Sequence, residues 1–190
     1  MNLEIPSSIE EEHAGLHALL TQATREPGAV GETARELAAL LHPHFEREEA
    51  FALPPLALLP ALARGEVTPQ MAPAVGMARQ LRQEMSSMLA DHGRIVEALD
   101  RLREAARNAG IAAYEDFCDA LIEHARNEEE VLYPAAILVG EHLERHLAPE
   151  LTRAAASGQE NAPATPSSAA PATAPPATPA TPTGSAPAAS

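Results

Sequence analysis

The sequence predicts an all-α protein: an up-down-up-down four-helix bundle with a short extra helix between helices two and three and a disordered C-terminal tail. Two observations lead to this fold class. Apolar residues recur with the period of an α-helix in four segments, and no segment shows the alternation typical of a strand. Histidines and glutamates also repeat from the first pair of segments to the second. The chain is therefore expected to form two similar helical hairpins.

The first hairpin is predicted over the N-terminal third of the chain. Its first helix covers residues 8–25, where the apolar residues form one stripe that includes His13. A Pro-Gly turn at 27–28 leads into a second helix over residues 30–53. Pro43 lies inside this second helix and should kink it, because proline removes a backbone hydrogen bond.

The second hairpin follows a short apolar segment, residues 55–66, which is expected to form a helix or turn over one end of the bundle. The third long helix should begin at residue 68 or 73 and end at residue 108. The fourth should cover residues 112–147, with a bend near Pro134.

The domain is predicted to span residues 1–153. Residues 154–190 are nearly all Ala, Pro, Thr and Ser, and Glu160 is their only charged residue. This composition provides no large apolar side chain to compensate for the entropy lost on ordering, so we expect a disordered tail.

The charge and the cysteine content restrict the partners and the compartment. The net charge of −14 makes nucleic acid and anionic membranes poor partners. Cys118 is the single cysteine and cannot form an internal disulfide. The sequence shows no export signal and no apolar run of about 18 residues, so we expect a cytoplasmic protein without a membrane span. We expect it to be a monomer.

The repeated motif is His-x-x-x-Glu. His44 and Glu48 form the first copy, and His124 and Glu128 form the second. On a helix, residues four apart leave the same face one turn apart, so each copy can chelate a metal. His13 and His92 precede the two copies by nearly the same interval. The predicted metal ligands are His13, His44, Glu48, His92, His124 and Glu128.

These six residue types point to a transition metal. A buried glutamate without a partner costs several kcal/mol, and a cation turns that cost into a binding site. Four imidazoles and two carboxylates suit Fe, Mn or Zn rather than Ca or Mg. Six ligands are enough for two metal ions, each held by two histidines and both bridged by the two glutamates. The Glu-x-x-His spacing of ferritin-like di-iron proteins is not found in either copy.

At these residues the chain resembles the hemerythrin-like, or HHE cation-binding, family over residues 5 to about 148. The resemblance rests on His13, His44-Phe45-x-x-Glu48-Glu49, His92 and His124-x-x-x-Glu128-Glu129-x-x-Leu132-Tyr133-Pro134. It implies a four-helix bundle around a non-haem di-iron centre with an oxo or hydroxo bridge. Iron is therefore expected ahead of Mn or Zn.

The resemblance is nearer to some branches of the family than to others. Oxygen-carrying members have a fifth histidine, four residues from another on the third helix, but Met88 and Val96 occupy the positions at that spacing from His92. The four-His, two-Glu set is more similar to the iron-sensing and iron–sulfur-cluster-repair branches. Reversible oxygen transport is therefore not expected.

The function expected from the sequence is a di-iron protein that binds or responds to O₂, NO, peroxide or iron. The alternative is an enzyme at the same centre that reduces peroxide or NO or repairs iron–sulfur clusters. Turnover needs electrons, and the sequence shows no flavin motif and no Cys pair, which favours binding. A third reading is a purely structural metal. Tyr114 and Tyr133 are the hydrogen-bond donors that we expect near the site.

Overall fold

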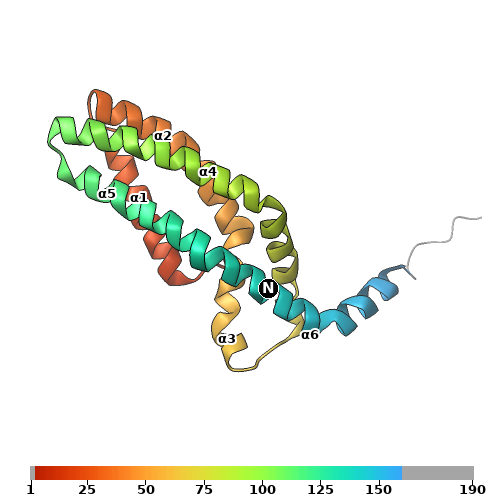
Figure 1. Cartoon of the computed structure of the whole chain (residues 1–190). Coiled ribbons are helices and arrows are strands. Elements are labelled where there is room, and N and C mark those ends of the chain that lie inside the picture. The colour runs from red at the N-terminus through yellow and green to blue at the C-terminus, as the bar shows by residue number, and fades with distance from the viewer. Residues whose placement is uncertain (1–2, 160–190) are drawn as a thin grey trace, which may run out of the picture.

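The computed structural model describes residues 3–159, and the part of the chain that it describes is helical, without strands. The long helices run alongside one another as a bundle (Figure 1). This confirms the predicted fold class. The long helices are α1 (Ser7–Ala23), α2 (Ala29–Arg47), α4 (Pro73–Ala109), α5 (Ala112–Asn127) and α6 (Tyr133–Gln159). α5 and α6 are joined without a break through a short helical turn and together form the fourth helix of the bundle.

Short helical segments connect or extend these helices. The predicted segment between the second and third helices forms a 3-10 helix and then α3. The short elements are η1 (Glu48–Ala52), η2 (Pro54–Leu58), α3 (Leu59–Ala63), η3 (Pro69–Met71) and η4 (Glu128–Leu132). The third long helix ends at Ala109, where Gly110 takes a left-handed conformation with φ of 71°.

The C-terminal helix is longer than predicted. α6 continues to Gln159, past the predicted domain end at residue 153, and projects beyond the other helices (Figure 1). Residues 160–190, which include most of the predicted disordered tail, lie outside the described residues. Within the described part of the chain, no helix is long and apolar enough to cross a membrane.

Two π-helical turns interrupt the helices at matching places in the two halves. They are η1, which begins at Glu48, and η4, which begins at Glu128. Each ends with a backbone hydrogen bond to the glutamate carbonyl, from the N–H of Leu53 in the first half and of Tyr133 in the second. The sequence predicted a kink at Pro43 and a bend near Pro134, but it did not predict these π-helical turns. In both halves a proline comes next and has no N–H to continue an α-helix.

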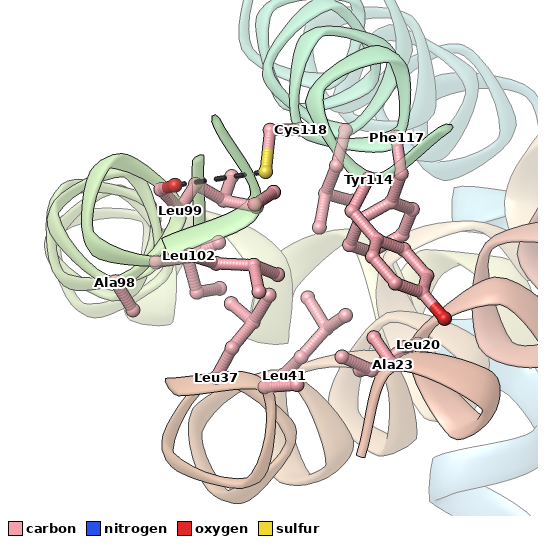
Figure 2. Close-up of a cluster of buried hydrophobic side chains, with 14 of the residues drawn as sticks. Leu20, Ala23, Leu37, Leu41, Ala98, Leu99, Leu102, Tyr114, Phe117 and Cys118 are labelled. Carbon is pink, nitrogen blue, oxygen red and sulfur yellow. Dashed lines mark hydrogen bonds between the residues drawn. The ribbon is translucent and has the colours of Figure 1, made fainter. Parts of the chain in front are cut away.

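The apolar core lies on both sides of one polar layer. One cluster fills the end of the bundle where α1, α2, α4 and α5 meet, with Leu37, Leu41, Leu99, Leu102 and Phe117 at its centre (Figure 2). A second cluster surrounds the two π-helical turns and contains, among others, Ile9, Phe51, Leu81, Met88 and Tyr133. Burying each such side chain contributes roughly 1.5–3 kcal/mol. Because the helices run from one cluster to the other, residues between them are forced into the interior whatever their polarity.

Gly140 provides a test of the contact between α4 and α6. A Cβ atom at this position would lie 2.1 Å from the Cβ of Ala78 on the facing helix. We expect Gly140→Ala to lower the free energy of unfolding by about 1–3 kcal/mol, because the two helices must move apart. Thermal unfolding of the metal-free protein measures this, with about 2–4 °C expected for each kcal/mol in a domain of this size.

Gly76→Ala is the matched control on α4, because no atom lies within 4 Å of a Cβ placed there. This change should stabilise the helix by about 0.5–1 kcal/mol, as alanine is the better helix former. Equal effects of the two substitutions would show that α4 and α6 do not pack as closely as described.

Candidate metal centre

The six predicted ligands meet in the polar layer between the two apolar clusters. Each is at most 3% exposed. Among residues 3–148, whose side chains the structure describes, they are also the only buried histidines and carboxylates. The structure therefore brings together every residue of the predicted set, while their ligation of a metal stays a prediction. The elements that supply them are α1 (His13), α2 and η1 (His44, Glu48), α4 (His92), and α5 and η4 (His124, Glu128).

The four histidines form two pairs. The Nε2 atoms of His13 and His124 lie 3.2 Å apart, and those of His44 and His92 lie 2.8 Å apart. Two nitrogens that bind one ion at about 2.1 Å and at a right angle are separated by about 3 Å. Each pair is thus spaced as two ligands of a single ion would be. We call these pairs the His13–His124 end and the His44–His92 end of the centre.

Glu128 extends between the two ends. Its Oε1 lies 3.0 Å from the Nε2 of His124, and its Oε2 lies 3.4 Å from the Nε2 of His92. Its carboxylate therefore presents one oxygen to each end.

Glu48 does the same from the opposite half of the chain. Its Oε1 lies 3.1 Å from the Nε2 of His44, and its Oε2 lies 3.9 Å from the Nε2 of His13. The ligand atoms form two groups, each within 4.8 Å, and the two glutamates belong to both. This is the arrangement of two positions bridged by two carboxylates.

A cation would satisfy atoms that the protein leaves without partners. The Oε2 of Glu48 and the Oε1 of Glu128 are buried and make no hydrogen bond. An unsatisfied buried acceptor costs about 1–3 kcal/mol, and more when it is charged. These orphaned oxygens both face the His13–His124 end. The donor set of imidazole nitrogens and carboxylate oxygens fits a divalent or trivalent transition metal.

The acid–base properties of the centre show how the metal-free protein tolerates two buried carboxylates. Burial raises the pKa of Glu48. Burial also acts to raise the pKa of Glu128, but the neighbouring imidazoles of His124, His13 and His92 outweigh it and hold that pKa well below its usual value. Burial acts to lower the pKa of His124, but the carboxylate of Glu128 and the other nearby carboxylates raise it to about 9. Protonated imidazoles thus balance the carboxylates until a metal replaces their protons.

A second set of carboxylates surrounds the four imidazoles. Each histidine that turns its Nε2 inward turns its Nδ1 toward an outer carboxylate, as metal-binding histidines commonly do. The Nδ1 atoms of His13 and His92 hydrogen-bond to these carboxylates, whereas those of His44 and His124 make no hydrogen bond. The pairs and their N···O distances are His92–Glu129 (2.7 Å), His124–Glu12 (3.2 Å), His13–Glu49 (3.4 Å) and His44–Asp91 (3.7 Å).

Sequence reasoning missed the role of these outer carboxylates. Glu12 and Asp91 directly precede the histidines of α1 and α4, and Glu49 and Glu129 directly follow the bridging glutamates. The repeat contained a signal for this role, because each outer carboxylate has a counterpart at the matching position in the other half of the chain. What the spacing did not show is that Glu12 faces a histidine of the other hairpin.

The two tyrosines expected near the site lie in different places. Tyr133 is at the centre, where its hydroxyl donates a hydrogen bond to the Oε1 of Glu48 and lies 3.4 Å from the Nε2 of His92. Tyr114 is not at the centre, because its hydroxyl binds Glu26 at 2.8 Å beside the apolar cluster of Figure 2.

The other four histidines do not belong to this group. His17 and His42 contact each other, with ring centroids 5.1 Å apart, and His142 contacts His146 on α6. None of the four is buried.

Comparison with known proteins gives one match. A family model described as the hemerythrin HHE cation binding domain matches residues 5–136 and 83–166. Together these matches cover most of the chain, including all six residues of the centre. Neither a curated protein nor a solved structure matches the chain.

The charge balance of the centre predicts that the stability of the protein changes with pH in opposite directions with and without metal. Because the folded-state pKa of His124 is raised from 6.5 to about 9, its contribution to the stability of the metal-free protein is complete below about pH 6.5 and lost as the pH rises through 9. The free energy of unfolding should fall across this range, by at most about 1.4 kcal/mol per pH unit for one proton. Metal-loaded protein should instead gain stability from about pH 5 to 7, because bound imidazoles carry no proton.

Chemical denaturation of the metal-free and the metal-loaded protein, each across its own pH range, measures how their stabilities depend on pH. The control is metal-free His124→Gln, which lacks the titrating group and should show a smaller fall. A metal-free wild type whose stability stays level or rises between pH 6.5 and 9 would contradict this charge balance.

Proposed function

This chain belongs to the hemerythrin HHE cation-binding domain family, and on that basis we propose that it is a non-haem di-iron protein that binds a small ligand such as NO, O₂ or peroxide. The six ligands would be the four buried histidines and two buried glutamates of the centre. His13 and His124 would hold one ion, and His44 and His92 the other.

One observation carries this proposal: each glutamate presents one oxygen to each histidine pair. A single ion would need only one of the two histidine pairs, and the other histidine pair would remain buried without a cation. Two groups that share both carboxylates, in contrast, give each ion two nitrogens and two oxygens. Iron suits this mixture of imidazole and carboxylate ligands, and Mn and Zn are the alternatives.

Bound iron would supply a redox-active Lewis acid with a position for an exogenous ligand, and the protein residues provide its setting. Glu48 and Glu128 offset the positive charge of the ions. Glu49 and Glu129 hold the imidazole rings of His13 and His92 so that their Nε2 atoms face inward. The apolar clusters limit the ligand to a few atoms, since fully buried residues such as Met88 and Leu121 line the neighbouring turns of α4 and α5.

The position of Cys118 favours ligand binding over catalytic turnover. Catalysis of peroxide or NO reduction needs a route for electrons, and the chain's single thiol is not placed to provide one. Cys118 is fully buried in the apolar cluster of Figure 2, where it contacts the carbonyl of Leu99. Burial raises the pKa of this thiol to about 11, which keeps it protonated and unreactive at neutral pH.

Ligand addition to iron-loaded protein tests the proposed function. Azide should shift the visible absorption of the diferric protein, and NO should bind the diferrous form. His17→Ala, a change outside the centre, should leave both responses intact, whereas Glu128→Ala should abolish them together with iron retention. If neither ligand perturbs the spectrum of fully loaded protein, the site is closed and the metal is structural.

A further inference from the structure

The two halves of the chain differ at one buried position near the centre, where one half has a hydroxyl group and the other half does not. In the register that matches His124 with His44, Tyr133 matches Leu53. Both side chains are fully buried, and both belong to the apolar cluster around the π-helical turns. The second half of the chain therefore has a hydroxyl group at this position, where the first half has an aliphatic side chain.

The hydroxyl of Tyr133 lies at the His44–His92 end. Its ring stacks on the ring of His92, with centroids 5.8 Å apart and planes at 19°. Its oxygen lies 3.4 Å from the Nε2 of His92 and donates a hydrogen bond to the Oε1 of Glu48, which is also the oxygen nearest His44. Rotation of this hydroxyl away from Glu48 would direct its proton to an acceptor atom bound at the same end.

The charges around the centre distinguish the same end. Asp91, the outer carboxylate of His44, also pairs with Arg47 at 2.5 Å and with Arg94. Its counterpart Glu12 has His124 as its ion-pair partner within the described residues. Two guanidinium groups thus lie near the His44–His92 end, where they offset the negative charges of Asp91 and of Glu84, which pairs with Arg47 at 2.8 Å.

The opposite end carries an aromatic ring, and a surface pocket lined by Glu12 and His124 lies on the same side. Phe45 stacks on His13, with centroids 4.3 Å apart and planes at 11°, and it also contacts the ring of His124 edge-on. A phenyl ring provides no donor to an anionic or polarised ligand.

We propose that the small ligand binds at the His44–His92 end, where the hydroxyl of Tyr133 donates a hydrogen bond to it. This inference rests on the proposed function and specifies the position and the chemical class of the ligand. The class is a small anion or polarised molecule with an acceptor atom, such as azide, NO or peroxide. Tyr133 is accordingly a specificity-determining residue, and Leu53, its counterpart in the first half, has no donor.

The test compares Tyr133→Phe with Tyr114→Phe, which removes a hydroxyl from a second largely buried tyrosine that binds Glu26 away from the centre. Three quantities are measured in each iron-loaded protein: the iron content, the azide affinity of the diferric form, and the shift of the N–O stretching frequency of the NO adduct on transfer to D₂O. Tyr133→Phe should keep its iron, lose the D₂O shift and bind azide about 5–10-fold more weakly, the equivalent of one hydrogen bond. Tyr114→Phe should behave as wild type.

An unchanged azide affinity and D₂O shift in Tyr133→Phe would overturn the inference and leave the proposed function standing. Wild-type protein that binds neither azide nor NO would instead overturn the proposed function itself. If Tyr133→Phe is unstable, Tyr133→Leu repeats the test with the residue that the other half uses. Loss of iron from both variants would also overturn the inference, because the hydroxyl would then serve to hold Glu48.

Discussion

The carboxylates of Glu48 and Glu128 lie at the centre of an apolar bundle, and the rest of the structure depends on balancing their charge. A buried carboxylate without a partner would cost several kcal/mol, a large fraction of the stability of a domain. Four imidazoles surround the pair, and four outer carboxylates face the imidazoles from the other side. The two apolar clusters on either side exclude water, which strengthens every charge interaction in the layer between them.

The repeat explains how one chain builds such a layer. Each hairpin contributes a histidine from one helix and a His-x-x-x-Glu from the next, and each glutamate begins a π-helical turn. π-Helical turns are frequent at functional sites, because they widen the helix and re-aim the side chains beside them. The outer carboxylates also join the hairpins, since Glu12 of α1 faces His124 of α5 and Asp91 of α4 faces His44 of α2. The centre thereby links all four helices of the bundle.

The bundle and the six buried residues could be predicted from the sequence because both follow from spacing along single helices. A residue at i+4 shares a face with residue i wherever the helix lies, and the second copy of the motif showed that the pattern was not a surface accident. The π-helical turns could not be predicted in this way, because they depend on hydrogen bonds that local composition does not specify. The roles of Asp91 and Tyr133 depend on which helices become neighbours, and spacing within one helix carries no such information.

The claim that joins these observations is that two matched half-sites hold two ions. Anaerobic titration of metal-free protein with Fe(II), followed by separation of free iron and elemental analysis, tests it most directly. The arrangement of Glu48 and Glu128 across both histidine pairs predicts that tightly bound iron rises to two ions per chain and then stays constant. A firm plateau at one ion per chain, with all six residues intact, would contradict the two-ion centre.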